Sequence, residues 1–420
     1  MNADNTPGSK RYAIVIIGVL FFIFGFITWL NATLIPYLKI SCELSNFESL
    51  FVAFAFYISY FVLALPSSWL LKKTGFRNGM SWGLATIALG SLLFIPAAVM
   101  RAYPVFLIGL FVQGAGLSIL QTASNPYVTI LGPIESAAKR ISIMGIANKV
   151  AGILSPTVLG WIVLKDVDAI SHRISGMDAV AKAAELDALS ARVIFPYIII
   201  AVLLVVLAAL IRLSQLPEVE QTEEKVAGNT PQRSLFSYGY LWLGALAIFV
   251  YVGAEVIAVD TIINYGKSLG IGFDTSRFFA SLTLFAMVGG YVFGIAMIPK
   301  IIQQDKALAL MALLAIAFTV AAVFSPWVYV SVLFVALLGF ANAIMWPAIW
   351  PLSIEGLGRH TKTGSAILIM GIAGGATLPL LYGALSDMPQ VGTQHAYLVI
   401  IPCYLYVLFF ALKGHRIGKG

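Results

Sequence analysis

Charged side chains are scarce in this chain. Asp, Glu, Lys and Arg make up 11% of its 420 residues, and hydrophobic residues make up 60%. Soluble domains carry about 25% charged residues, so this composition could not cover a water-facing surface. The apolar runs are roughly 20 residues long, which is the length a helix needs to cross a bilayer. Since a barrel would show short alternating segments instead, the composition predicts a helical membrane protein with many spans.

Cysteine is scarce as well, and this excludes several kinds of site. Cys42 and Cys403 have neither the spacing of metal ligands nor that of a redox pair. The Gly-rich stretches 289–294 and 371–375 lie inside apolar runs, without the strand and helix that a nucleotide-binding loop requires. The sequence therefore predicts neither an enzyme nor a cofactor. The net charge of +7 lies in short loops, as the positive-inside rule explains, so nucleic acid is not expected as a partner.

The apolar runs predict twelve spans. Lys and Arg are concentrated on the side of the N-terminus, which predicts an inner-membrane protein with both termini in the cytoplasm. The outer loop at 177–191 is Ala-rich with spaced charges and predicts a short amphipathic helix. The predicted spans cover residues 12–38, 47–71, 79–99, 104–131, 141–165, 192–214, 238–263, 276–299, 306–325, 327–352, 362–385 and 395–413.

A polar, Glu-rich segment divides the spans into two sets of six. It predicts one six-helix bundle at 1–216, a cytoplasmic linker at 217–235 and a second six-helix bundle at 236–420. The motif Ile143–Ala147 recurs as Ile369–Ala373, 226 residues later, which indicates duplication. In transporters built from such parallel repeats, the substrate site lies near the membrane midplane between the two bundles. We therefore look for binding residues there.

Neutral amides and a tryptophan within the spans are the first candidates for that site. The first span contains Trp29 and Asn31, the fourth contains Gln121 and Asn125, and the fifth contains Asn148. Gln121 and Asn125 are four residues apart and share one helix face. Amides both donate and accept hydrogen bonds, which suits a hydroxyl-rich ligand such as a sugar. The alternative is that single amides serve as hydrogen bonds between helices.

The tenth span adds an aromatic pair. Trp346 and Trp350 are four residues apart and present one aromatic face, with Asn342 one turn before them. The apolar face of a pyranose packs on such rings while polar groups take its hydroxyls. The alternative is an aromatic belt at the membrane interface. The prolines beside the rings, Pro347 and Pro351, are tolerated where a helix borders a cavity.

Three ionisable residues lie within or at the end of spans. Lys149 in the fifth span must reach the interface, lose its proton or meet a carboxylate. Glu255 lies deep in the seventh span, and Asp260 lies near the outer end, where water could solvate it. Charged groups at such depth mark ion or substrate paths. We hypothesise that Glu255 binds a coupling cation or pairs with Lys149 in one transport state, and we assign Asp260 to the same coupling set.

Four segments of the sequence are distinctive together: Gly25–Asn31 with Pro36, Leu120–Thr129, Tyr251–Val256 and Leu408–Gly414. They resemble the motifs of the fucose permease and glucose/galactose transporter family of the major facilitator superfamily. The resemblance extends over essentially the whole chain. It implies an all-α fold of twelve transmembrane helices in two pseudo-symmetric bundles, and a monomer in the lipid bilayer that transports a small sugar.

The chain departs from the proton-coupled fucose permease type at two positions. Ala32 stands where that type carries an Asp, and Gln121 stands where it carries a Glu. The resemblance therefore implies Na⁺ rather than H⁺ as the coupling cation, with Glu255 among its oxygen ligands. We expect uptake of a hexose such as glucose or galactose by alternating access. An uncoupled facilitator, an N-acetylglucosamine or fucose symporter, and an amphiphile or drug exporter stay open.

Overall fold

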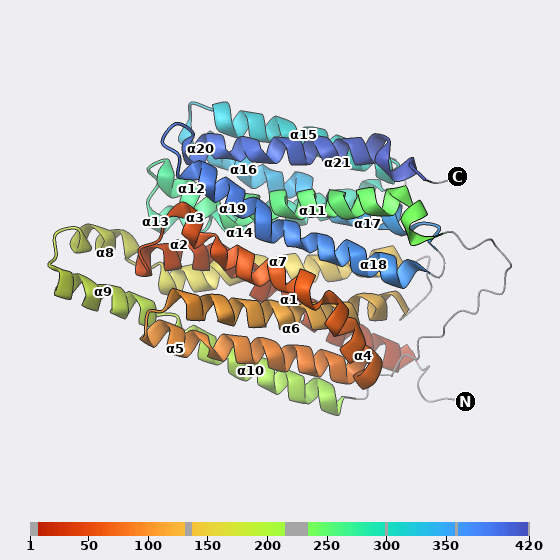
Figure 1. The fold of residues 1–420 in the computed structure, drawn as a ribbon, viewed down its shortest axis with the longest axis horizontal. Helices are drawn as coiled ribbons and strands as arrows, with labels where there is room; N and C mark the ends of the chain where they lie inside the picture. Colours follow the sequence, from red (N-terminus) through yellow and green to blue (C-terminus); the bar gives the residue numbers. More distant parts are fainter. Residues whose placement is uncertain (1–6, 131–136, 215–233, 299–300, 358–359, 419–420) are drawn as a thin grey trace.

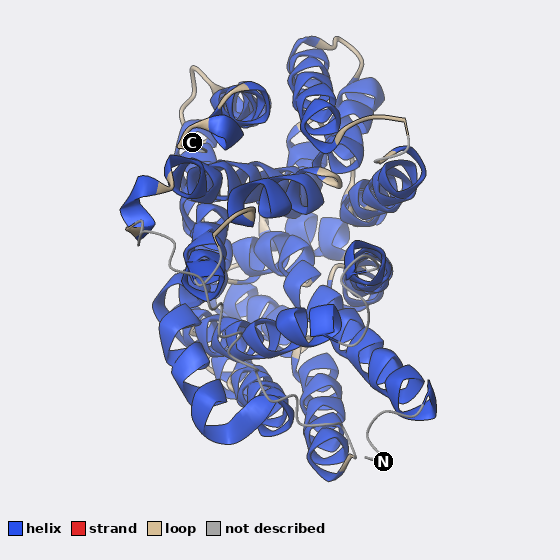
Figure 2. Ribbon diagram, turned by 90° about the vertical axis from the view of Figure 1, so that its right-hand side faces the viewer, coloured by secondary structure: helices blue, strands red, loops and turns tan. Residues whose placement is uncertain are grey.

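The structure in Figure 1 is a computed structural model that describes residues 7–130, 137–214, 234–298, 301–357 and 360–418. Regular secondary structure in these residues is helical, and Figure 2 shows the helices in cross-section. Twelve segments of the described chain are long and apolar enough to cross a membrane, as predicted. They are Val15–Ser41, Asn46–Leu71, Lys73–Val99, Tyr103–Ser124, Ile143–Val163, Ala179–Leu213, Gly239–Asp260, Phe273–Met297, Gln304–Phe324, Val328–Ile354, Thr363–Ser386 and Gly392–Leu412.

The first six spans occupy the lower part of Figure 1. We call them the first half. The short helix predicted at 177–191 is present as Ala179–Ala191, the second of two short helices that precede the main helix of the sixth span. The helices of this half are α1 (Pro7–Trp29), α2 (Asn31–Ser41), α3 (Asn46–Ser49), α4 (Phe51–Leu92), α5 (Phe94–Val99), α6 (Tyr103–Ile130), α7 (Ala137–Val163), α8 (Val167–Ile174), α9 (Ala179–Ala191) and α10 (Ile194–Leu213).

The last six spans occupy the upper part of Figure 1, and we call them the second half. Most of the predicted linker at 217–235 lies outside the described residues, so the boundaries of the two bundles stay predictions. The helices are η3 (Leu235–Ser237), α11 (Gly239–Asp260), α12 (Ile262–Ser268), α13 (Phe273–Ser276), α14 (Phe279–Met297), α15 (Gln304–Phe324), α16 (Val328–Asn342), α17 (Met345–Ile354), α18 (Thr361–Met370), η5 (Gly371–Ala373), α19 (Gly374–Ser386), α20 (Gly392–Ala396), η6 (Tyr397–Val399), α21 (Ile400–Leu412) and η7 (Gly414–Arg416).

The two halves meet along three pairs of spans: α7 packs on α14, α4 on α19, and α2 on both α11 and α12. Helix α1 begins and α21 ends at the same end of the molecule, on the right in Figure 1. We call this the terminal end and the opposite one the far end. Helices α3, α8, α9, α12 and α20 lie at the far end.

Three spans are interrupted near the middle of the bundle. The first span changes from α1 to α2 at Leu30, the tenth from α16 to α17 at residues 343–344, and the eleventh passes through the 3₁₀ turn η5. Pro347 lacks a backbone donor and lies in the first turn of α17, where that loss costs least. Such breaks are tolerated where a helix lines a cavity. They therefore indicate where the site lies.

The first and fifth spans of each half pack so closely that only glycine fits between them. A Cβ on Gly25 of α1 would lie 1.8 Å from the carbonyl oxygen of Asn148 on α7. A Cβ on Gly374 of α19 would lie 1.7 Å from the carbonyl oxygen of Phe249 on α11. Asn148 and Gly374 are also 226 residues apart, the offset of the sequence repeat. The equivalent pairs of spans thus approach each other closely in both halves, although the glycine lies on the first span in one half and on the fifth span in the other.

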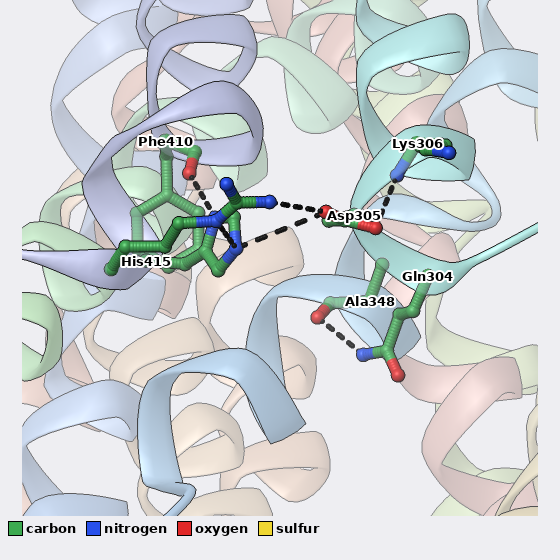
Figure 3. Close-up of polar contacts among 7 residues, drawn as sticks. Gln304, Asp305, Lys306, Ala348, Phe410 and His415 are labelled. Atoms are coloured by element: carbon green, nitrogen blue, oxygen red, sulfur yellow. Dashed lines mark hydrogen bonds and ion pairs between the residues drawn. The ribbon is translucent and has the colours of Figure 1, made fainter. Parts of the chain in front are cut away.

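Polar contacts hold the end of the last span against the start of α15 (Figure 3). His415 is 5% exposed, and its Nδ1 lies 3.0 Å from the carbonyl oxygen of Phe410. Arg416 donates to the Asp305 carboxylate at 3.2 Å, at the start of α15. Gln304 donates to the carbonyl oxygen of Ala348 at 2.7 Å and joins α15 to α17. The sequence assigned no role to this histidine, which is structural.

One local expectation differs from the structure. Water could have solvated Asp260 at the end of its span, but its exposed fraction is 0%, and α2 packs on both α11 and the following α12. The second and third spans are joined by a sharp kink of α4 at Gly75, whose φ is 77°. Glycine tolerates that left-handed conformation without the steric cost of a Cβ.

Candidate functional site: a cavity between the two halves

A cavity of about 190 Å³ lies between the two halves. Both halves contribute to its wall, and its depth matches the breaks in the first, tenth and eleventh spans. The cavity thus lies where the sequence predicted a binding site. The first half contributes Phe21, Phe24, Thr28, Trp29, Tyr57, Tyr60, Gln121, Gly145, Asn148 and Lys149, and the second half contributes Tyr251, Val252, Glu255, Val256, Tyr291, Trp346, Pro347 and Ile372.

An ion pair crosses the cavity from one half to the other. Lys149 Nζ on α7 lies 3.1 Å from Glu255 Oε1 on α11, and the two side chains are only 8% and 10% exposed. The ammonium also lies 4.2 Å from the centre of the Trp29 ring, a cation–π contact. Lys149 therefore does not reach the membrane interface. Of the two roles considered for Glu255, cation binding and pairing with Lys149, the second is the arrangement in this conformation.

The Trp29 ring packs against the backbone of α7 at Gly152, where the absence of a side chain leaves room for it. A Cβ on Gly152 of α7 would lie 2.4 Å from Cδ1 of the Trp29 ring. The indole Nε1 is buried without a hydrogen-bond partner among the described residues. Because its ring faces the Lys149 ammonium, Trp29 positions the ion pair as well as lining the cavity.

The amides of the first half lie on one wall of the cavity. Gln121 Nε2 donates to the Tyr60 hydroxyl at 3.0 Å. Asn148 Nδ2 donates to the carbonyl oxygen of Phe21 at 3.3 Å. In each bond the amide uses a donor, so the carbonyl oxygen of each amide is left to accept from a ligand. The side chain of Asn125 lies outside the described residues, so its predicted role stays untested.

The aromatic pair of the tenth span is stacked. The rings of Trp346 and Trp350 are 5.4 Å apart with an angle of 26° between their planes. Trp346 lines the cavity with Pro347, whereas Trp350 packs behind it. The second half thus offers an aromatic surface across from the amides.

Three predicted site residues are buried outside the cavity wall. Asn31, Asn342 and Asp260 are 1%, 0% and 0% exposed, and none of the three lines the cavity. Both polar side-chain atoms of each lack a hydrogen-bond partner in the described part of the chain. The sequence places these three residues within or at the end of spans, but it does not show which face of the helix carries each side chain.

Tyrosines are the cavity residues that the sequence did not single out. Tyr57 and Tyr60 come from α4, Tyr251 from α11 and Tyr291 from α14. Tyr57 and Tyr60 are stacked with their ring centres 6.4 Å apart. Their spacing of three residues, and the spacing of four between Tyr251 and Glu255, would have placed them on shared helix faces. Tyrosine was overlooked because it also serves as an ordinary core residue.

Comparison with known proteins identifies the class. The sequence profile of the Major Facilitator Superfamily matches residues 17–379, and the chain belongs to this superfamily. It is accordingly a multi-pass membrane protein, and the all-α fold of twelve spans predicted from the sequence is confirmed.

Its relatives confirm the resemblance drawn from the motifs. The glucose/galactose transporter of Brucella abortus is 37% identical over 417 residues, covering 98% of this chain and 96% of the relative. The L-fucose-proton symporter of Escherichia coli K12 is 30% identical over 420 residues, covering 97% and 95%. The crystal structure of FucP in the outward conformation is 28% identical with a TM-score of 0.72, covering 96% of this chain and 98% of that one.

Proposed function

We propose that this protein takes up a hexose such as glucose or galactose across the inner membrane, by alternating access and with its termini in the cytoplasm. The names of its relatives support the substrate class. The distribution of Lys and Arg supports the orientation. The cavity between the halves supports the mechanism, because a site shared by two halves is exposed to either side as they rock.

The observation that carries the proposal is the composition of the cavity wall. Gln121 and Asn148 present amide oxygens from the first half, and Trp346 presents a ring from the second. The sugar hydroxyls donate to the amides while an apolar sugar face packs on the ring. The volume of about 190 Å³ is below the range of about 300–1,000 Å³ for drug-sized ligands. This favours a monosaccharide over an amphiphile or drug.

Contacts between the halves support alternating access. Asp387 at the end of α19 accepts three hydrogen bonds from Asn46 and Phe47 at the start of α3. Ser281 of α14 is bonded to Thr157 of α7 at 2.7 Å. These contacts lie towards the far end, so that end is the closed one here. Transport then requires these bonds to break and the terminal end to close.

The ion pair between Lys149 and Glu255 bears on how sugar binding is coupled to movement of the halves. The sodium expectation depended on a free carboxylate at Glu255, and that carboxylate is bonded to Lys149 in this conformation. The pair has no net charge, so it links the halves without needing an ion. Sugar hydroxyls entering the cavity compete for Lys149 and Glu255, which loosens this link and couples binding to movement of the halves.

The proposal is tested by exchange of labelled glucose in proteoliposomes without any ion gradient. Galactose, fucose and N-acetylglucosamine are added as competitors to rank the substrates. The variant Gln121→Ala removes one hydrogen-bonding group, worth roughly 1–1.5 kcal/mol, so its KM is expected to rise about tenfold. The matched control is Gln113→Ala, because Gln113 is the other glutamine of α6 and bonds to Ser91 away from the cavity.

The outcomes separate the alternatives. Exchange inhibited by hexoses, with a raised KM only in Gln121→Ala, supports the proposal. Equal KM values in both variants would remove Gln121 from the site. Exchange of amphiphilic compounds but of none of the four sugars would replace the proposal with the exporter.

A further inference from the structure

Asp260 is a third buried ionisable group in the spans, and no opposite charge is paired with it among the described residues. The buried ionisable side chains of the described spans that are charged at neutral pH in water are Lys149, Glu255 and Asp260. Lys149 and Glu255 neutralise each other. Asp260 is 0% exposed, and neither of its oxygens has a hydrogen-bond partner among the described residues. A lone carboxylate in such a place is far more costly than the neutral acid.

Asp260 continues the helix face that lines the cavity. Val252, Val256 and Asp260 follow one another at intervals of four, and both valines belong to the cavity wall. Asp260 is five residues beyond Glu255, which places it about 7.5 Å further along the helix axis towards the far end. It therefore lies just past the cavity, in the part of the molecule that is closed here.

The surroundings of Asp260 belong to both halves. A Cβ on Gly375 of α19 would lie 3.0 Å from Cγ2 of Val256 and 3.1 Å from Cγ of Tyr57. Tyr57 is on α4 of the first half and lines the cavity. Helix α2, also of the first half, packs on α11 and on α12, which follows Asp260 in the chain. The end of α11 is thus packed against the first half, and we expect separation of the halves at the far end to expose Asp260.

The titratable groups around Asp260 offer it no opposite charge. The hydroxyls of Tyr397 and Thr261 bond to each other, and that of Tyr265 bonds to Ser331. Other titratable groups on the elements packed there include Glu255 and Tyr251 on α11, Tyr57 on α4, Tyr37 on α2, Tyr291 on α14, Tyr382 on α19, and Cys403 and Tyr404 on α21. The neighbouring cations are engaged elsewhere: Lys39 with Asn46, Lys149 with Glu255, Lys267 over the Phe273 ring and Arg277 with Asp274.

We propose that Asp260 is the carboxylate that carries the coupling proton of the sugar transport proposed above. The carboxylate takes one proton from water when the far end is open, and the halves close there only around the neutral acid. When the helices between Asp260 and the cavity move apart, the proton leaves past the Tyr57 hydroxyl to water on the terminal side. Each cycle moves one proton and no other charge through this group.

A proton fits this place better than a sodium ion does. Sodium requires several oxygen ligands at once, and neither oxygen of Asp260 has a polar partner in the described chain. A proton needs no ligand other than the carboxylate. The two acidic positions of the proton-coupled fucose permease type are occupied here by Ala32 and Gln121, so a carboxylate at another place is required for proton coupling.

The first experiment measures glucose accumulation in proteoliposomes under an imposed proton gradient, a sodium gradient or neither. We expect the proton gradient alone to drive accumulation by the wild type. Asp260→Asn should exchange glucose within twofold of the wild type but accumulate none above equilibrium. Asp260→Glu should restore accumulation with a displaced pH profile. The control is Asp274→Asn, because Asp274 is also at the far end but its side chain is 74% exposed.

The second experiment does not depend on the sugar. The infrared carbonyl stretch of a protonated carboxyl group is measured in purified wild type and Asp260→Asn. A band present in the wild type and missing in Asp260→Asn supports the assignment, even if the sugar proposal fails. Sodium-driven accumulation by the wild type, proton-driven accumulation by Asp260→Asn, or the same infrared band in both proteins would each overturn it.

Discussion

The ion pair between Lys149 and Glu255 defines the centre of the molecule at the scale of single residues. Each partner comes from a different half, and each is only about a tenth exposed. Taking one charge away leaves the other buried and uncompensated, which is more costly than removing both. The pair therefore makes the two halves depend on each other, and this dependence is measurable.

We predict that Lys149→Met or Glu255→Gln alone lowers the free energy of unfolding by about 3–5 kcal/mol. The double variant should recover most of this loss, because no uncompensated charge remains. Thermal unfolding of the four proteins in one detergent gives the coupling energy. The control is Arg173→Met, since the ion pair of Arg173 with Glu185 is exposed and such pairs contribute about 0–1 kcal/mol. Additive effects of the two single changes would contradict the prediction.

Close helix packing decides the geometry of the site at the scale of elements. Helices α1 and α7 approach until the backbone of Asn148 touches Gly25. This contact places the Asn148 side chain on the cavity wall and lets its amide reach the Phe21 carbonyl. The position of the amide wall therefore depends on a residue without a side chain.

We predict that Gly25→Ala destabilises the protein by about 1–3 kcal/mol, because its Cβ has no space. It should also raise the KM for sugar, since α7 moves away with Asn148. Gly18→Ala is the control on the same helix, because the nearest atom to its Cβ would be the Met144 sulfur at 3.9 Å. Thermal unfolding and glucose exchange measure the two effects. Equal stability of the two variants would show that α1 and α7 tolerate separation.

The bonds at the far end hold one conformation at the scale of the whole molecule. Asp387 accepts from the Asn46 backbone at 3.1 Å, the Asn46 amide at 2.7 Å and the Phe47 backbone at 2.8 Å. These partners belong to different halves. Their loss therefore lowers the stability of the conformation closed at the far end and leaves each half unchanged.

We predict that Asp387→Ala shifts the population towards a state open at the far end. A loss of about 1.4 kcal/mol changes the ratio of the two states tenfold. Pulsed electron paramagnetic resonance between labels at Val180 and Tyr329, which are 82% and 68% exposed on opposite halves, measures the distance across that end. Asp187→Ala is the control, because its ion pair with Arg101 lies within the first half. Identical distance distributions for wild type and Asp387→Ala would contradict the prediction.

Sequence alone determined the class of fold, because lipid imposes a simple rule on every span. Each crossing segment must be a helix of about 20 apolar residues. Such segments can be recognised in the sequence without knowledge of any tertiary contact. The repeat of Ile143–Ala147 at Ile369–Ala373 and the amides of Gln121 and Asn148 were visible for the same reason. Polar residues in an apolar run stand out, so several polar residues that line the cavity could be named from the sequence.

Tertiary structure decided which of these residues meet. Within an apolar span both faces look alike in sequence, since one faces lipid and the other faces apolar neighbours. This is why Asn31 and Asn342 were assigned to the cavity, although packing buries them outside its wall. Asp260 ends a span, where water could solvate it, but its exposed fraction is 0% in the folded chain. Burial by distant parts of the chain is a property of the fold, and it leaves this carboxyl group without a hydrogen-bond partner among the described residues.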